Sequence, residues 1–376
     1  MRERLRHMLI KEFIQVFRDP RMRAVILVAP LLQLVVFGYA VTTDVKHVAT
    51  AVYDLDNSVT SRELVSRFVE SGYFDVAEHV ANEARMRELL DRGEARVVLH
   101  MDKGFEDDLR AGRTAQLQIL VDGTDSNTAG IVLGYSAKIT GQFSQEVLNA
   151  QMRRVLGGTR PPGQVELQTR AWFNENLESR NFYVPGVVAM IVTLVTLLLT
   201  SMAVVREKEI GTMEQILVTP ITPVEFILGK TLPFALFSFV DVIIITLVAV
   251  LWFGVPIRGS LALLLFATAL YLLTTLGIGL LISTVSQTQQ QAMMTTFFFF
   301  MPAVLLSGFM FPIANMPRVV QWLTYLNPFR YFLVIIRGIF LKGVGPGILW
   351  PQMLALWVIG TVILGLTSRR FRKTLA

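Results

Sequence analysis

The stretch from residue 301 to residue 343 reads MPAVLLSGFMFPIANMPRVVQWLTYLNPFRYFLVIIRGIFLKG, and the interpretation of the whole chain depends on it. The stretch is strongly apolar, but four prolines interrupt it, and each removes a backbone donor and breaks or kinks a helix. Its four cations are Arg318, Arg330, Arg337 and Lys342. They recur so often that no window of about 20 residues after Phe311 is free of charge, as a spanning helix requires. We therefore predict a spanning helix that ends near Phe311, followed by short re-entrant or interfacial helices over residues 312–343.

The composition of the whole chain indicates a membrane protein with several spans. Of its 376 residues 53% are hydrophobic and 17% are charged, and the mean hydropathy is +0.51. Six apolar runs are long enough to be predicted as transmembrane helices: residues 24–41, 182–205, 231–253, 261–285, 292–311 and 348–366. The fold class predicted is a polytopic α-helical membrane protein with six transmembrane helices and an inserted extracytoplasmic α/β domain between the first two.

Both ends of the chain are basic, which sets the predicted orientation. Residues 1–23 hold seven Lys/Arg against three acids, and the tail 368–376 adds four more cations. Cytoplasmic flanks of membrane spans carry an excess of Lys and Arg, so both termini are expected in the cytoplasm. The first transmembrane helix is assigned to residues 24–44 and the other five to residues 182–367. Leu5, Leu9, Phe13, Val16 and Phe17 form one stripe of an amphipathic helix over residues 1–23, which we expect to lie on the membrane surface.

Gly38-Tyr39-Ala40 resembles a signal-peptide cleavage site at the end of the first apolar run. The 23 residues before that run are too many for a signal peptide, and the run itself is longer than the usual apolar core of one. We therefore favour an uncleaved span.

Residues 45–181 change character and predict a mixed α/β domain. Apolar stretches at residues 48–53, 95–100 and 115–122 alternate with helical patterns at 60–70, 82–90 and 104–109, and one long helix follows over residues 125–156. Asn57 and Ser58 are candidates to cap the first helix, and Asn82 the second. The loop GGTRPPG at residues 157–163 marks a boundary. The chain has no cysteine, so no disulfide stabilises this domain.

This domain shows no catalytic or metal-binding pattern. His47, His79 and His100 lack metal-ligand spacing, and Asp122 and Asp125 are better explained as helix-capping residues in a strand-to-helix turn. No basic patch with interleaved aromatic residues suggests a nucleic-acid partner.

Residues 206–230, REKEIGTMEQILVTPITPVEFILGK, form the larger predicted cytoplasmic loop. Gly211 breaks the preceding helix, and Pro220 and Pro223 restart one toward the third span, which suits docking onto a soluble partner. The sequence ILGKT at its end is not a phosphate-binding loop. That motif needs a glycine five residues before Gly229, where Val224 stands, and a preceding strand.

Several stretches together carry a family resemblance. LLSGFMFPIANMPRVVQWLTYLNPFRY (305–331), the loop 206–230, RNFYVPGVVAMIV (180–192) and IKEFIQVFRDPRM (10–22) resemble the membrane permease subunits of ABC transporters of the type-2 exporter family. The large domain between the first two spans is similar to the bacterial drug-exporter subgroup rather than to the short-looped polysaccharide exporters. The resemblance implies a bacterial inner-membrane permease that exports amphipathic or hydrophobic drug-like molecules and is not itself an enzyme.

The resemblance also implies partners. These are two cytosolic ABC ATPase subunits that bind ATP and Mg²⁺, since this chain holds no cofactor of its own, and a second permease chain, either identical or a sister. A periplasmic adaptor protein is a further candidate partner, and the lipid bilayer surrounds the spans. The residues expected to transmit force from the ATPases are Lys11, Glu12, Gln15, Arg18, Glu207, Glu209, Gly211 and Glu214.

The substrate pathway is predicted from fewer residues. Phe297, Phe298 and Met301 belong to an aromatic and thioether surface in the fifth span, of which a part is expected to line the pathway. Asp241 is the acid well inside a predicted span, and it either couples protons or cations or accepts a structural hydrogen bond from a neighbouring Ser or Thr. The outer segment is expected to be shaped by Ser307, Gly308, Pro312, Pro317, Asn327 and Pro328.

Other functions remain open at this point. The same machinery would also suit a lipid or glycan-type substrate. A secondary transporter driven by an ion gradient would need inverted repeats and more intramembrane charge than one aspartate. A membrane-anchored receptor would explain residues 45–180 but not six spans. The polar loop 286–291, SQTQQQ, either contacts the ATPase or forms a polar entrance.

Overall fold

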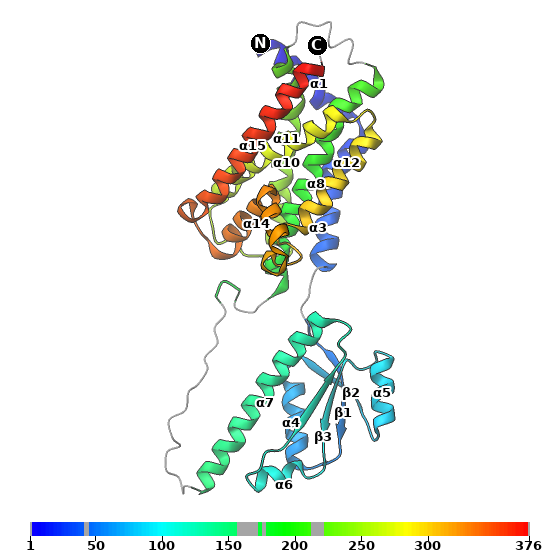
Figure 1. The fold of residues 1–376 in the computed structure, drawn as a ribbon, viewed down its shortest axis with the longest axis vertical. Helices are drawn as coiled ribbons and strands as arrows, with labels where there is room; N and C mark the ends of the chain where they lie inside the picture. The colour runs from blue at the N-terminus through cyan, green and yellow to red at the C-terminus, as the bar shows by residue number, and fades with distance from the viewer. Residues whose placement is uncertain (1, 41–44, 156–171, 175–177, 212–221, 375–376) are drawn as a thin grey trace. The chain divides into compact units, whose positions relative to one another are not determined.

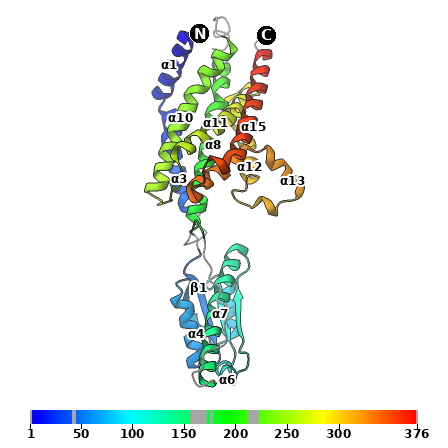
Figure 2. The ribbon, with the colours of Figure 1, turned by 90° about the vertical axis from the view of Figure 1, so that its left-hand side faces the viewer.

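A computed structural model describes residues 2–40, 45–155, 172–174, 178–211 and 222–374 of the chain. The chain forms two compact units. One combines Met1–Thr42 with Arg170–Ala376 and is helical, and the other is Thr43–Thr169 and contains a β-sheet. Figures 1 and 2 show the elements of each unit.

The helical unit is a bundle of long apolar helices. Its helices are α1 (Arg2–Arg18), α2 (Pro20–Arg23), a π-helical turn (Ala24–Val28), α3 (Ala29–Ala40), α8 (Ser179–Ile210), α10 (Pro223–Leu251), α11 (Leu261–Val285), α12 (Gln289–Leu305), α13 (Arg318–Leu323), α14 (Pro328–Arg337) and α15 (Pro346–Thr374). Four helices among the described residues, α8, α10, α11 and α15, are long and apolar enough to cross a membrane. The chain is therefore a multi-pass membrane protein, as its composition predicts.

Helix α8 lies at the centre of the bundle. It packs against α3, α10, α11, α12 and α14, and 78% of its most apolar window is buried. Two glycines allow these close contacts. A Cβ on Gly186 would meet the Phe309 ring at 2.4 Å, and a Cβ on Gly279 of α11 would meet Oγ1 of Thr200 on α8 at 2.5 Å. A glycine at each of these positions therefore makes room for the side chain of a neighbouring element.

The segment after α12 breaks into short helices, but it begins earlier than the sequence predicts. Helix α12 ends at Leu305 rather than near Phe311, because Pro302 lies in its last turn and Gly308 turns the chain with φ +85°. Short 3₁₀ turns at Ile313–Asn315 and Thr324–Leu326 alternate with α13 and α14, and a π-helical turn follows at Gly338–Lys342. Pro312 and Pro317 stand directly before the first turn and α13, and Pro328 opens α14. Prolines thus start these pieces, as their missing N–H favours.

The sheet unit contains four strands in the order β2-β1-β3-β4. They are β1 (Val48–Asp54), β2 (Phe74–His79), β3 (Val97–Met101) and β4 (Leu117–Val121). The first three are parallel, and β4 is antiparallel to β3, with Val97 opposite Val121. The sequence patterns predict three of these strands. They do not predict β2, because FDVAEH contains two acids and a histidine among six residues and is therefore not an apolar stretch like the other three.

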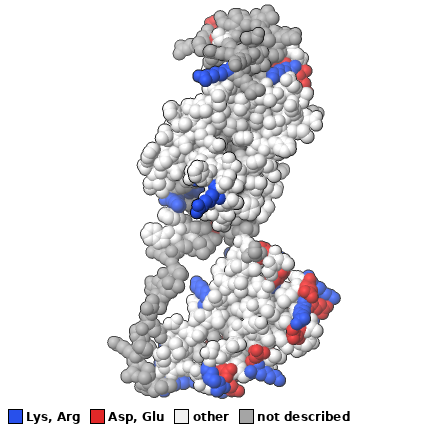
Figure 3. All heavy atoms as spheres, viewed as in Figure 1, with Lys and Arg blue, Asp and Glu red and all other residues white. Residues whose placement is uncertain are grey.

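Helices cover both faces of this sheet. They are α4 (Val59–Glu70), α5 (Glu83–Asp91), α6 (Phe105–Arg110) and α7 (Ser126–Val155). Side chains alternate along a strand, so Val97, Leu99 and Met101 join one apolar cluster with α4, α6 and α7, while Val98 joins another with α5. The long helix α7 runs beside the sheet in Figure 1. Figure 3 shows acidic and basic side chains intermixed on this unit, whereas the visible face of the helical unit is largely uncharged.

Most of the predicted caps are present. The side chains of Ser58 and Asn82 accept from the backbone N–H of Ser61 (3.0 Å) and Arg85 (2.8 Å). Asn57 is not a cap, since its backbone has φ +47° and its side chain accepts from Arg62 instead.

The two aspartates of the strand-to-helix turn also bond to the backbone. Asp122 accepts from the N–H of Thr124 at 3.0 Å, and Asp125 accepts from the N–H of Asn127 at 3.1 Å. The prediction that they hold the turn is therefore confirmed. In the part of the chain that the structure describes, no group of three His, Asp or Glu residues is arranged to hold a metal ion.

Candidate functional site

Helix α8 ends in four consecutive charged residues, Arg206-Glu207-Lys208-Glu209, here named the charged end of α8. Gly211 terminates the helix with φ +78°, and its N–H bonds back to the carbonyls of Glu207 and Lys208. Successive residues of an α-helix point about 100° apart, so four in a row point to different sides. The charged end of α8 therefore reaches several neighbouring elements at once.

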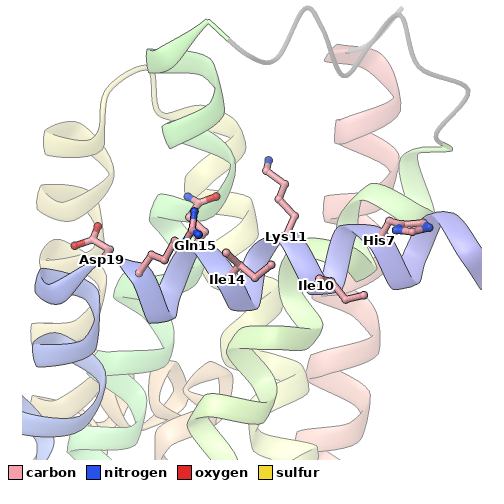
Figure 4. Close-up of a pocket in the computed structure, with 7 residues that line it drawn as sticks. His7, Ile10, Lys11, Ile14, Gln15 and Asp19 are labelled. Atoms are coloured by element: carbon pink, nitrogen blue, oxygen red, sulfur yellow. The ribbon is translucent and has the colours of Figure 1, made fainter.

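Glu207 belongs to a buried ion cluster. Nζ of Lys230 on α10 lies 2.5 Å from Oε1 of Glu207 and 2.7 Å from Oε1 of Glu12 on α1. Nζ of Lys11 lies 3.1 Å from the same Glu207 oxygen. Lys230, Glu12 and Glu207 are only 2%, 3% and 4% exposed. These four residues, the ion cluster, join α1, α8 and α10 (Figure 4 shows Lys11 on α1).

Because the ion cluster is buried, each of its charges needs an opposite charge beside it. Removing an ion from water costs on the order of several kcal/mol of hydration free energy. Only a well-placed opposite charge offsets that cost. Lys230 is the cation between two buried carboxylates, while the Lys11 side chain is 52% exposed. Gly229, next to Lys230, lies directly under the Met8 side chain of α1, whose Sδ would be 2.4 Å from a Cβ at this position. The Gly-Lys pair of the ILGKT sequence thus brings two helices together.

The other three residues of the charged end reach α11, α12 and the end of α1. Nζ of Lys208 donates to the carbonyl oxygens of Thr284 (3.0 Å) and Ser286 (3.3 Å) at the C-terminal end of α11. Glu209 accepts from the side-chain amide of Gln289 (2.6 Å) at the first turn of α12. A cation at a helix C-terminus and an anion at an N-terminus are both favoured by the helix dipole.

Arg206 completes the set of contacts. Its Nη2 lies 3.7 Å from the carboxylate of Asp19, which follows α1. The charged end of α8 thereby contacts the ends or flanks of four other helices. The loop 286–291 is part of this network, because Ser286 and Gln289 belong to it.

The structure divides the predicted force-transmitting residues into two groups. Glu12 and Glu207 are buried in the ion cluster and do not face outward. Lys11, Arg18, Glu209 and Gly211 are exposed, Gln15 is half-buried, and Glu214 lies outside the described residues. Contact of these residues with an ATPase stays a prediction. Sequence reasoning missed Lys230, Lys208 and Gln289, because their partners lie far away along the chain.

The structure shows the burial of Asp241 and of the α12 side chains that are predicted to line the substrate pathway. Asp241 on α10 is 3% exposed, and its Oδ2 has no hydrogen-bond partner among the described residues. The nearby Ser238 pairs with Thr196 on α8 at 2.9 Å. On α12, Phe300 is buried at 6%, whereas Phe297, Phe298 and Met301 are exposed by 44%, 82% and 57%. Contact of these residues with a substrate stays a prediction.

The outer segment is held by local bonds. Ser307 donates to the carbonyl of Val304 and accepts from the N–H of Phe309, which closes the turn after α12. Asn327 caps α14 and donates to the carbonyl of Ala303 at 2.6 Å. The guanidinium of Arg337 stacks 3.7 Å from the ring centroid of Phe182 at the start of α8. These contacts attach the segment to α12 and α8.

These features together define a multi-pass membrane protein in which a chain of ionic contacts joins the helix ends. The chain belongs to the ABC-2 transporter family, since the family model described as "ABC-2 family transporter protein" matches residues 20–369. The family resemblance seen in the sequence is thereby confirmed. Membership implies a transport subunit that works with an ATPase partner and in a dimeric arrangement.

Three relatives from Escherichia coli (strain K12) align over nearly the whole chain. The probable multidrug ABC transporter permease YbhR is 35% identical, with 99% of each chain covered. The probable multidrug ABC transporter permease YbhS is also 35% identical, covering 99% of this chain and 97% of its own length. The inner membrane transport permease YhhJ is 31% identical, covering 92% and 93%.

Proposed function

We propose that this chain is the permease subunit of an ATP-driven exporter that moves amphipathic or hydrophobic drug-like molecules out of the cytoplasm or inner leaflet. Two cytosolic ATPase subunits, which bind ATP and Mg²⁺, supply the energy, and a second permease chain, identical or a sister, completes the pore. The proposed substrate class rests on the whole-length similarity to two permeases whose names state multidrug transport. The observation that carries the mechanism is the set of contacts made by the charged end of α8.

The position of these contacts supports a route by which force enters the bundle. The loop between α8 and α10 is flanked on one side by the charged end of α8 and on the other by Lys230. A push on this loop therefore acts on both helices, and the ion cluster and Lys208 pass it to α1 and α11. Packed helices switch between discrete arrangements rather than deforming smoothly. The loop thus serves as the lever that opens the pathway inward or outward.

We further propose six spans in a bacterial inner membrane. Two shorter helices, the apolar helix over Ala24–Ala40 and α12, are the fifth and sixth spans in addition to the four long helices. Each of these has 17 residues, or about 25 Å of helix, slightly less than the roughly 30 Å of a hydrocarbon core. With six spans both basic termini lie in the cytoplasm and residues 45–181 lie outside. A periplasmic adaptor is a further candidate partner for this outer domain.

Labelling of single cysteines tests this topology directly, because the chain contains none. A cysteine in place of Arg87 should react with a membrane-impermeant thiol reagent in intact spheroplasts. A cysteine in place of Arg369 should react only after permeabilisation. Equal access at both positions would contradict the six-span arrangement.

Co-purification followed by reconstitution tests the function. The isolated complex should contain an ATPase, and a drug should stimulate its ATP hydrolysis in proteoliposomes. Charge reversal in the loop, Glu214→Lys, should abolish that stimulation without affecting insertion, whereas Asp107→Lys on the exposed surface of the sheet unit should not. Transport by the chain alone, driven by an ion gradient, would instead support a secondary transporter.

A further inference from the structure

We propose that the outward face of α1 binds anionic phospholipid in the inner leaflet, and that its cations select the charged headgroup. This face consists of His7, Ile10, Lys11, Ile14, Phe17 and Arg18. The proposal does not require the chain to be a drug exporter, since it concerns lipid binding by the purified permease alone.

An apolar stripe runs along this face. Ile10, Ile14 and Phe17 follow one another at helical spacing and are exposed by 43%, 49% and 56%. The opposite face of α1 is fixed against the bundle by the buried Glu12 and Val16. Three large apolar side chains on a firmly packed helix need an apolar partner beyond the chain itself.

The stripe continues an apolar surface on α10. The ring centroids of Phe13 and Phe17 lie 5.3 and 5.8 Å from that of Phe237, which is in the middle of α10. Helix α1 therefore packs against the middle of α10 and not only against its end. On α10 the side chains of Leu232, Leu236 and Val240 are exposed by 41–46%. In a membrane-spanning helix such side chains face acyl chains. In Figure 4, α1 runs across the helices behind it, as expected for a helix lying along the leaflet that the others cross.

Two cations, Lys11 and Arg18, accompany the stripe. His7, Lys11 and Arg18 line one shallow hollow on this face together with Ile10 and Ile14, and Figure 4 shows Lys11 extending above the isoleucines. The acids of this region are mostly neutralised, because Glu12 pairs with Lys230 and Asp19, which also lines the hollow, lies 3.7 Å from Arg206. Lys11 is itself paired with Glu207 at 3.1 Å, so Arg18 supplies most of the positive charge that this face presents beside its apolar side chains.

This combination suits a phospholipid better than a soluble ATPase. Acyl chains cover the isoleucines and Phe17, and a phosphate accepts hydrogen bonds from the guanidinium of Arg18. Each basic residue near an anionic leaflet adds about 1 kcal/mol of attraction, which corresponds to roughly fivefold in affinity. The sequence assigns Lys11, Gln15 and Arg18 to ATPase contact, and the test below distinguishes the two partners.

Native mass spectrometry of the purified full-length chain, titrated with phosphatidylglycerol or phosphatidylcholine, tests the proposal. Arg18→Gln should weaken phosphatidylglycerol binding about fivefold and leave phosphatidylcholine binding unchanged, and Arg18→Lys should retain both. Ile14→Gln should weaken binding of both lipids. Arg87→Gln removes the same charge from an exposed site of the sheet unit and should change neither.

Two results would overturn the proposal. One is unchanged phosphatidylglycerol binding by a folded Arg18→Gln chain. The other is loss of ATPase association by this variant in lipid-free detergent while its lipid binding stays normal, which would make the face a protein contact. Because lipid binding is measured without an ATPase, a failure of the exporter proposal would leave this result unaffected.

Discussion

Replacement of Lys230 by methionine is the most direct test of the ion cluster. Methionine keeps much of the length of the side chain and removes its charge. Glu12 and Glu207, only 3% and 4% exposed, would then face each other with Lys11 as the nearest cation, and that side chain is half in solvent. Breaking one buried ion pair costs about 3–5 kcal/mol, because the remaining charge stays buried without a partner. We expect Lys230→Met to lower the free energy of unfolding by about this amount.

A triple variant separates charge from packing. Glu12→Gln, Glu207→Gln and Lys230→Met together remove all three buried charges while keeping similar volumes. Replacing a whole buried ion network by neutral groups is often close to neutral for stability. The triple variant should therefore recover most of the stability that Lys230→Met loses. Lys342→Met, at an exposed lysine of the same unit, serves as the control and should change stability little.

The measurement is unfolding of the purified chain in mixed micelles, with increasing SDS, followed by tryptophan fluorescence. The same variants are then assayed for ATP hydrolysis with the ATPase partner present. If the cluster transmits force, the triple variant should be stable but uncoupled, with drug-stimulated hydrolysis reduced to the basal rate. Equal stability of Lys230→Met and the control, or no recovery in the triple variant, would refute the reasoning about buried charge.

Three further predictions concern the helix packing, the buried aspartate and the sheet unit. Gly279→Ala should destabilise the chain by about 1–3 kcal/mol in the same unfolding assay, since its Cβ would meet Thr200 at under 3 Å, whereas Gly365→Ala has open space and should be near neutral. Asp241→Asn should leave folding intact and transport nearly so in proteoliposomes, and complete loss of transport with normal assembly would favour a proton- or cation-coupling role. In the sheet unit, hydrogen bonds from threonines two and three residues on lower the pKa of Asp122 and Asp125. Carboxyls with a lowered folded-state pKa stabilise above the unfolded value near 4, so hydrogen-exchange protection of residues 117–155 should fall as the pH drops below about 4.

The sequence predicts the fold well where one signal dominates. Long uninterrupted apolar runs predict α8, α10, α11 and α15, because about 20 consecutive apolar residues are what a helix needs to cross the hydrocarbon core. Caps and turn residues likewise predict the helices of the sheet unit. Edge strand β2 gives a weak signal because two acids and a histidine interrupt its six residues, and the end of α12 is predicted too late because the sequence stays apolar through Phe311, after the helix has ended.

The candidate site was harder to predict, for a physical reason. Charged residues next to a membrane span are usually solvated, and Glu12 and Glu207 are accordingly predicted among the residues that transmit force from the ATPases. Their burial depends on a cation contributed by another helix, and Lys230 lies 218 positions from Glu12 in the sequence. Helical periodicity reports which face of one helix is apolar, but it contains no information on which helix packs against that face.

The ILGKT sequence shows how the same residues support a different role once their surroundings are known. As a phosphate-binding loop it lacks the first glycine and the preceding strand, and the structure places Gly229 and Lys230 within α10. There the glycine allows α1 to approach, and the lysine neutralises two acids that would otherwise hold α1 and α8 apart. Without Lys230 the two acids would keep only the half-exposed Lys11 as a cation, and with a Cβ at position 229 the Met8 side chain of α1 would have to move. The two residues therefore lie at one helix contact, and Gly229→Ala should lower the free energy of unfolding in the SDS assay by less than Lys230→Met does, because the flexible Met8 side chain can move while every charge of the ion cluster is kept.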